Sequence, residues 1–470
     1  MPFEDMIFGS YDKAEHNARR AHELYEDGKI SQALLELEAA LEISPSNSAW
    51  HFDKALALDA INRFEEAIAE YETALELNPD DPDILNSLGI DYTRTGQYDL
   101  AISTFEHIQE LAPTFEPCYC NRIIAYTEME QHSLAEEMFY LAQQIKPDCA
   151  LCYYNIGNSL FIRGQYEKAI HCWQKTAKLE PTHPQINYRI AQAYWADGGG
   201  ERSREYFLAE LRTNPGDVDV ILDFGLFLLE VGDIESAKEK FNRILDFKPD
   251  SAVASFYLGE IALDNNDYEQ AVKLFNEALE KDSTLAGPRY RLAQCALRRG
   301  CEKETKAYLV SEVEREVGNA QVLASMASMF LRIGEPDYAT ACLLKALDID
   351  NASADAYYYL GFIQASKKRY EEAAEFFGHT LDIKPEHVLA LRDSAIVSVA
   401  MGKLNDAVEK IKKARLPDGS DPQLKRLERK LRLIQATERI GDFLCRFKPR
   451  FISHLLSRIW HLASRLAHHG

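Results

Sequence analysis

Apolar residues follow a helical spacing along this chain, and the same arrangement returns every 34 residues over positions 14–421. In the third repeat, residues 82–115, two runs of apolar positions at three- and four-residue spacing predict two amphipathic helices. The first run contains Leu85, Leu88, Gly89 and Tyr92, and the second contains Ala101, Phe105 and Ile108. Each repeat is therefore predicted to be a pair of helices joined by a tight turn.

The period divides the chain into an N-terminal segment (1–13), twelve repeats, a capping helix (422–435) and a C-terminal tail (436–470). The repeats span residues 14–47, 48–81, 82–115, 116–149, 150–183, 184–217, 218–251, 252–285, 286–319, 320–353, 354–387 and 388–421. Most repeats end near a proline, at Pro45, Pro79, Pro113, Pro147, Pro181, Pro215, Pro249 and Pro385. A constant period of this length indicates a solenoid, in which each unit stacks on its neighbours.

Two positions in each repeat call for small or flexible residues. The predicted turn is glycine in eight repeats and asparagine in two more, with Glu130 and Lys368 as exceptions. Glycine and asparagine tolerate the left-handed backbone that ends a helix. The eighth position is glycine or alanine in every repeat except the fourth, where Ile123 stands. Small side chains let two helix axes approach closely.

Together, the 34-residue period, the turn residues and the small positions resemble the tetratricopeptide repeat family over residues 14–421. The resemblance implies an all-α, right-handed superhelical solenoid of antiparallel helix pairs. It also implies that first helices line an inner groove and that second helices face outward. Proteins of this family bind peptides, partner helices or whole proteins, so protein or peptide ligands are expected.

The resemblance places the second, fifth, sixth, ninth and thirteenth positions of each repeat in the groove. In repeats four to six these positions supply amide, phenol and guanidinium groups, from Asn121, Tyr154, Asn155, Asn158, Tyr188, Arg189 and Gln192. An asparagine amide suits a peptide backbone because it both donates and accepts hydrogen bonds, and Arg189 suits a carboxylate. A second group is Arg289, Tyr290, Arg291 and Gln294. The alternative is that these polar residues only form the solvated inner surface of the solenoid and bind no specific ligand.

Some members of the family bind acidic C-terminal tails of chaperones through a clamp of lysine and asparagine residues. The positions that would carry lysine hold Tyr154, Leu151 and Gln185 here, so this clamp is incomplete. The sixth and ninth repeats depart from the pattern at several small positions. We expect either looser stacking at these two repeats or ordinary sequence drift.

The nine cysteines are odd in number and scattered, which argues against a disulfide framework and for a reducing compartment. Four of them lie close together in sequence, at Cys118, Cys120, Cys149 and Cys152. Paired cysteines at such spacings occur in zinc sites. The simpler interpretation is that these are free cysteines in small buried positions. We therefore expect no metal and no cofactor, and these four cysteines are only weak candidates for metal ligands.

Charge is distributed unevenly. The protein has 53 Lys+Arg and 75 Asp+Glu, a formal net charge of −22 that makes nucleic acid an improbable partner. Residues 422–470 carry 11 Lys+Arg and 3 Asp+Glu, or +8, and the remainder is 42 against 72, or −30. The sequence has no secretory signal pattern and no apolar run of 18 residues. We therefore expect a cytoplasmic location, and peripheral association with a membrane is the alternative.

The C-terminal tail, 436–470, contains a predicted amphipathic helix. Its apolar face includes Phe451, Leu455, Ile459, Trp460 and Leu466. Three surfaces could bury this apolar face. They are an anionic membrane, a second copy of the tail or a partner helix, and the acidic solenoid of the same molecule.

The sequence predicts a non-enzymatic adaptor or scaffold that binds protein ligands in its groove and uses the tail for attachment or regulation. It contains neither a glycine-rich phosphate loop nor an HExxH motif. The alternative function is a regulatory or assembly subunit of an enzyme complex or of membrane-associated assembly machinery.

Overall fold

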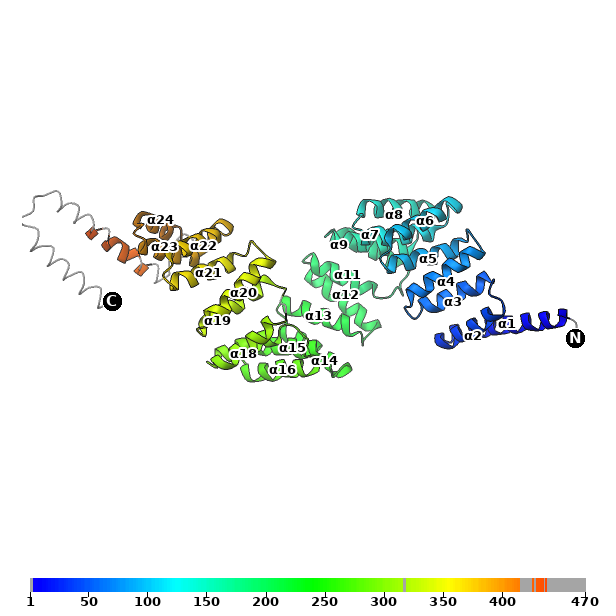
Figure 1. The fold of residues 1–470 in the computed structure, drawn as a ribbon, viewed down its shortest axis with the longest axis horizontal. Helices are drawn as coiled ribbons and strands as arrows, with labels where there is room; N and C mark the ends of the chain where they lie inside the picture. Colours follow the sequence, from blue (N-terminus) through cyan, green and yellow to red (C-terminus); the bar gives the residue numbers. More distant parts are fainter. Residues whose placement is uncertain (1–2, 316–317, 415–424, 427, 435, 438–470) are drawn as a thin grey trace, which may run out of the picture. The chain divides into compact units, whose positions relative to one another are not determined.

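The computed structural model describes residues 3–315, 318–414, 425–426, 428–434 and 436–437. These residues form α-helices and turns, and no strand occurs among them. The predicted all-α repeat fold is confirmed (Figure 1).

The odd-numbered helices are the first helices of successive repeats. They are α1 (Phe3–Glu26), α3 (Ser48–Asp59), α5 (Pro82–Arg94), α7 (Glu116–Glu128), α9 (Ala150–Ile162), α11 (Ile186–Ala196), α13 (Val218–Glu230), α15 (Ala252–Asp264), α17 (Pro288–Arg298), α19 (Ala320–Arg332), α21 (Ala354–Ser366) and α23 (Val388–Ala400). Helix α1 begins at Phe3, whereas the first repeat was predicted to begin at residue 14. The helical backbone therefore extends into the predicted N-terminal segment.

The even-numbered helices are the second helices of the repeats. They are α2 (Ile30–Ile43), α4 (Phe64–Leu77), α6 (Tyr98–Leu111), α8 (His132–Ile145), α10 (Tyr166–Leu179), α12 (Gly200–Thr213), α14 (Ile234–Phe247), α16 (Tyr268–Lys281), α18 (Glu302–Val313), α20 (Pro336–Ile349), α22 (Tyr370–Ile383) and α24 (Leu404–Ala414). Each packs against the first helix of its own repeat.

The turn position adopts a left-handed backbone in all twelve repeats. Its φ angle is positive at each glycine and also at the four other residues, Asn62, Glu130, Asn266 and Lys368, where it lies between 58° and 60°. A left-handed residue ends the first helix and reverses the chain. Glu130 and Lys368, the sequence exceptions, take the same conformation, so the fold imposes the turn even on residues that disfavour it.

Glycine at the eighth position lets an aromatic ring of the second helix approach the first helix. A Cβ atom on Gly157 would lie 2.5 Å from Trp173 Nε1, and one on Gly89 would lie 2.5 Å from Phe105. Both rings are buried, Phe105 completely and Trp173 at 1% exposure. The sequence predicted that small residues let the two helices of a repeat approach closely. The structure shows that glycine is needed at these positions because a Cβ atom would clash with the aromatic ring of the second helix.

The protein divides into two compact units, unit 1 (Met1–Phe247) and unit 2 (Lys248–Gly470). Within each unit, first helices of neighbouring repeats lie side by side, as α7 and α9 do in unit 1 and α19 and α21 do in unit 2. We call the surface that the first helices of a unit form its first-helix face. The division falls at the end of α14, within the last residues of repeat seven, and so does not coincide with repeat six or repeat nine.

Repeats six and nine nevertheless share a distinct local structure. Their first helices, α11 and α17, have 11 residues and begin after a residue with positive φ, Gln185 (54°) and Gly287 (102°). Both repeats bury a glutamate on the second helix, Glu210 at 2% exposure and Glu312 at 4%. Glu312 Oε1 accepts a hydrogen bond of 3.1 Å from Gly287 N, so this carboxylate holds the shortened start of α17.

After α24, the described residues of 425–437 are helical, within and just beyond the predicted capping helix. Leu431 is 2% exposed and packs in the cluster of Ala395, Ala407 and Ile411. Ile434, about one helical turn after Leu431, is 37% exposed. Of these two apolar residues, only Leu431 therefore packs on the last repeat.

Candidate functional site

The predicted groove residues lie on α7, α9 and α11, on the first-helix face of unit 1. Two of the asparagines link neighbouring first helices. Asn121 Nδ2 donates to Asn86 Oδ1 at 2.9 Å. Asn155 is 4% exposed, and its Nδ2 donates to the carbonyl oxygen of Cys120 at 3.1 Å. The amide group of Asn155 thus holds α9 to α7.

Tyr154 and Asn158 lie on the same helix and differ in their contacts. The Tyr154 ring packs on His183, with 4.4 Å between ring centroids. The half-buried Asn158 makes no side-chain hydrogen bond to any residue that the structure describes. Its amide is therefore available to a ligand.

An aspartate on α13 joins two of the predicted residues. The Tyr188 hydroxyl donates to Asp223 Oδ2 at 2.6 Å, and Gln192 Nε2 donates to the same oxygen at 2.9 Å. Burial raises the pKa of the Tyr188 phenol, and the neighbouring Asp223 carboxylate raises it further. The phenol is therefore a proton donor at neutral pH, and the three side chains bind α11 to α13.

Arg189 lacks an acidic partner among the described residues. Its Nη1 donates only to Gln192 Oε1, at 3.4 Å. Its Nε is buried and has no acceptor in the described structure. A guanidinium group has five N–H donors, and most of those on Arg189 remain free for an anionic or carbonyl group of a ligand.

A hollow of about 370 Å³ adjoins these residues. It is lined by Phe161, Gln192, Trp195, Ala196 and Glu230, from α9, α11 and α13. Trp195 Nε1 donates to Glu230 Oε2 at 2.7 Å. The hollow therefore combines two aromatic side chains, which suit an apolar side chain of a ligand, with a carboxylate at its edge.

The second predicted group lies on α17, on the first-helix face of unit 2. Tyr290, Arg291 and Gln294 line a hollow of about 500 Å³, together with residues of α15 and α19. Arg291 differs from Arg189 because its Nη2 donates to Glu260 Oε2 at 2.5 Å. Burial raises the pKa of Glu260, and Arg291 opposes that shift.

These two sites are equivalent, position by position, at a separation of 102 residues, which is three repeats. Tyr188, Arg189 and Gln192 correspond to Tyr290, Arg291 and Gln294. The linings of the hollows correspond as well, with Phe161, Trp195, Ala196 and Glu230 matching Leu263, Leu297, Arg298 and Arg332.

Several residues of the unit 1 site were missed from the sequence. Asp223 and Glu230 occupy the sixth and thirteenth positions of repeat seven, which are groove positions by the same rule. The predicted groove residues came from repeats four to six and repeat nine, and the same positions of repeat seven hold both of these acids. Phe161 and Trp195 occupy the twelfth position, which the rule did not include.

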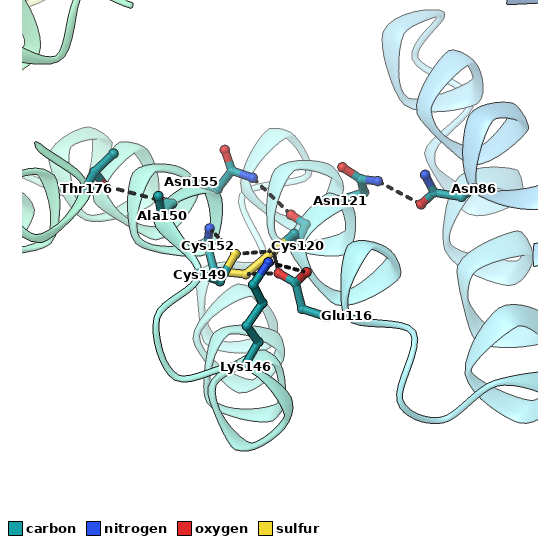
Figure 2. The surroundings of a disulfide bond; sticks show 10 residues. All are labelled: Asn86, Glu116, Cys120, Asn121, Lys146, Cys149, Ala150, Cys152, Asn155 and Thr176. Atoms are coloured by element: carbon teal, nitrogen blue, oxygen red, sulfur yellow. Dashed lines mark hydrogen bonds and ion pairs between the residues drawn. A yellow bond between two sulfur atoms is a disulfide. The ribbon is translucent and has the colours of Figure 1, made fainter. Parts of the chain in front are cut away.

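The four cysteine candidates separate into a cluster of three and one outlier. Cys120 and Cys152 form a disulfide, with 5.2 Å between their Cα atoms, and Cys149 lies beside them (Figure 2). The prediction of free cysteines is wrong for this pair, because α7 and α9 lie side by side and bring their first turns together. Cys118 is a buried free thiol outside the cluster. Burial raises the pKa of the Cys118 and Cys149 thiols to about 11.

The tail residues Phe451, Leu455, Ile459, Trp460 and Leu466 lie outside the described residues. In the part of the protein that the structure describes, no helix is both long and apolar enough to cross a membrane.

Sequence profiles identify the repeat. One described as "TPR repeat" matches residues 60–96 and 157–198, and one described as "Tetratricopeptide repeat" matches residues 222–286 and 326–387. The fold and the first-helix faces define a protein-interaction scaffold built from helical repeats. The chain belongs to the tetratricopeptide repeat family, whose members are generally non-catalytic adaptors.

Individual similar proteins resemble the chain in part or at low identity. Human protein O-mannosyl-transferase TMTC3 is 34% identical over 85 residues, which is 18% of this chain and 9% of that protein. The crystal structure of yeast Tom70 is 13% identical, with a TM-score of 0.41, over 91% of this chain and 96% of Tom70. The Cut9–Hcn1 hetero-tetramer structure is 12% identical, with a TM-score of 0.44, over 89% of this chain and 96% of the matched chain.

Proposed function

We propose that the protein is an adaptor that binds a peptide or protein segment on the first-helix face of unit 1. The segment lies across α9, α11 and α13, and Arg189 binds one of its carboxylates. Asn158 hydrogen-bonds its backbone, and an apolar side chain enters the hollow between Phe161 and Trp195. The single observation that carries this proposal is the guanidinium of Arg189, which forms no ion pair with any acid that the structure describes and whose hydrogen-bond partner Gln192 lines that hollow.

The charge of the protein restricts the ligand. The protein has a net charge of −22, so its long-range field disfavours a strongly acidic segment. One carboxylate held by two parallel hydrogen bonds to a guanidinium still binds well. The expected ligand therefore has an isolated carboxylate, such as a free C-terminal carboxylate or a single acidic side chain, next to an apolar residue.

The test begins with the partner that copurifies in stoichiometric amount with the full-length protein. Its affinity, measured with both proteins purified, should fall for Arg189→Ala and for Asn158→Ala. Arg291→Ala is the matched control, because that arginine occupies the equivalent position and is already paired. Asn155→Ala is unsuitable as a binding variant, since it would loosen α9 from α7. Equal affinity for Arg189→Ala and the wild type would show that the ligand uses another surface.

The identity of the copurified partner separates the adaptor from the alternative function. A stoichiometric catalytic subunit would support a regulatory role, whereas several substoichiometric clients would support an adaptor. We further propose a cytoplasmic location with the tail as the attachment element. Flotation with anionic liposomes, compared with a variant ending at residue 435, tests this. Equal flotation of the two proteins would refute membrane attachment by the tail.

A further inference from the structure

Four metal-ligand groups converge where the first turns of α7 and α9 meet. They are Glu116, Cys120, Cys149 and Cys152, and their ligand atoms all lie within 4.8 Å of one another (Figure 2). Cys120 Sγ is 3.5 Å from Cys149 Sγ. With Zn–S bonds of about 2.3 Å, two sulfur ligands of a tetrahedral zinc ion lie about 3.8 Å apart. The Cys120–Cys149 separation is therefore close to that of a zinc site, whereas the bonded sulfur atoms of Cys120 and Cys152 would have to move apart on reduction.

The disulfide alone does not account for Glu116. Its Oε1 lies 2.9 Å from Cys120 Sγ and 3.2 Å from Cys152 Sγ. A disulfide sulfur carries no proton, so in the bonded state neither contact is a hydrogen bond. The Glu116 side chain is 13% exposed, and its other oxygen is 3.9 Å from Lys146 Nζ. The Cys149 thiol is the sulfur group that can donate to this carboxylate, and a cation held by the reduced cluster would explain its contacts to the other two sulfur atoms.

We propose that the reduced cluster binds one zinc ion, with the thiolates of Cys120, Cys149 and Cys152 and the carboxylate of Glu116 as its four ligands. A dithiol reductant, itself oxidised to a disulfide, converts the Cys120–Cys152 bond into two thiols. Zinc then replaces the protons of three thiols, which are released to solvent. Three thiolates select zinc over harder cations such as magnesium. Because the protein fills all four positions, the site is structural.

Groups around the cluster support metal binding. Cys149 is the N-cap of α9, and its Sγ accepts a hydrogen bond of 3.2 Å from Cys152 N. The helix N-terminus and this hydrogen bond favour a thiolate and so oppose the burial that raises the pKa of the Cys149 thiol in the metal-free protein. Asn155 fixes α9 to α7 through the Cys120 carbonyl, one turn from the ligands. The three cysteines are at most 5% exposed, which protects the site from solvent.

The ligands come from two neighbouring repeats, so the ion would join them. Glu116 and Cys120 belong to α7, Cys149 precedes α9, and Cys152 belongs to it. Zinc bound to the folded protein and not to its unfolded chain stabilises the fold. This site is separate from the proposed ligand site at Arg189, so either proposal stands without the other.

The test uses full-length protein that has been reduced, stripped with a chelator and then given zinc. Metal analysis after removal of free ion should find one zinc per protein molecule. Cobalt in place of zinc should give the visible absorption and the sulfur-to-metal charge transfer of a tetrahedral thiolate site. Cys149→Ala should weaken zinc binding by at least about 100-fold, more than the loss of an outer-shell partner does. Glu116→Gln should weaken it too.

Cys118→Ala is the matched control, since Cys118 is a buried cysteine of α7, two residues before Cys120, and lies outside the cluster. It should keep one zinc per protein molecule. Protein with the Cys120–Cys152 disulfide formed should bind none. Absence of zinc from the reduced wild type, or its retention by folded Cys149→Ala, would overturn the proposal. If Cys149→Ala loses its helical circular dichroism, Glu116→Gln decides, and unchanged zinc affinity there would exclude Glu116 and with it the proposed site.

Discussion

Repeats six and nine carry the same tyrosine, arginine and glutamine on their first helices, but the charges around these three side chains differ. In repeat six, Asp223 of the following repeat accepts hydrogen bonds from Tyr188 and Gln192, and Arg189 forms no ion pair with any acid that the structure describes. In repeat nine, the acid belongs to the preceding repeat, where Glu260 pairs with Arg291. Ser325 holds the position equivalent to Asp223, and Asn158 holds the one equivalent to Glu260.

The hollows beside these arginines have opposite charges at their edges. Unit 1 has Glu230 where unit 2 has Arg332, and Ala196 where unit 2 has Arg298. In unit 1, Arg189 therefore lies next to Tyr188 without an acidic partner among the described residues. In unit 2, the positive charges at the hollow come from Arg298 and Arg332. If the proposed function is correct, the neighbours of a repeat, rather than the repeat itself, decide which ligand charge each site accepts.

The largest effect is expected from Arg189→Ala. A hydrogen-bonded contact to a charged group contributes about 1.5–3 kcal/mol, so affinity for the partner should fall by about 10- to 150-fold. Isothermal titration with the purified partner measures this. Arg291→Ala, the equivalent change in unit 2, should leave the affinity within about twofold. Equal losses for the two variants would break the proposed difference between the sites.

Asn158→Glu should give repeat six the acid that repeat nine has. Positions 158 and 189 are separated by 31 residues, as are Glu260 and Arg291. The new carboxylate should pair with Arg189 and compete with the ligand, lowering affinity by about tenfold, a change of about 1.4 kcal/mol. The same titration checks this, with Asn158→Gln as the uncharged control. Unchanged affinity for Asn158→Glu would mean that Arg189 does not bind the ligand.

Glu260→Asn makes the converse change in unit 2. It removes the partner of Arg291, and because that arginine is about a third exposed, the loss should be about 1 kcal/mol. Chemical denaturation monitored by circular dichroism measures the stability of the protein. Glu269→Gln, a change in the first turn of α16, serves as the surface control. Stability equal to that of the wild type would show that the Arg291 pair contributes nothing.

The smallest effects concern the two tyrosines. Tyr188→Phe removes a hydrogen bond of 2.6 Å to Asp223 and should destabilise unit 1 by about 1–1.5 kcal/mol. Tyr290→Phe should cost less than about 0.5 kcal/mol, since the described residues provide its hydroxyl with no hydrogen-bond acceptor. Thermal denaturation of the two variants gives the comparison. A larger shift for Tyr290→Phe would reverse it.

The fold could be predicted from the sequence because several independent features recur with the same 34-residue period. The turn residues, the small eighth position and the helical spacing agree in almost every repeat, so each supports the others. Even Glu130 and Lys368, which break the turn rule, adopt its backbone conformation. The shortened helices α11 and α17 were not predicted, because their starts depend on single residues with positive φ, Gln185 and Gly287.

The site was only partly predictable. Periodicity placed Arg189 on a first helix, but its lack of an acidic partner among the described residues depends on the side chains at positions 158 and 223 of neighbouring repeats, 31 and 34 residues away. The family resemblance gave Asn155 a place in the groove, whereas the structure uses it to hold two helices together. The approach of Cys120 to Cys152 required the side-by-side packing of α7 and α9, which spacing alone does not specify.

The most direct test of the ligand site places a photoreactive amino acid in each hollow and identifies where the purified partner is crosslinked. Position 196 lines the hollow of unit 1, and position 298 is its exposed equivalent in unit 2. We expect efficient crosslinking from position 196, and we expect it to disappear when Arg189→Ala is added. Crosslinking from position 298 alone, or crosslinking from position 196 that Arg189→Ala leaves unchanged, would contradict it.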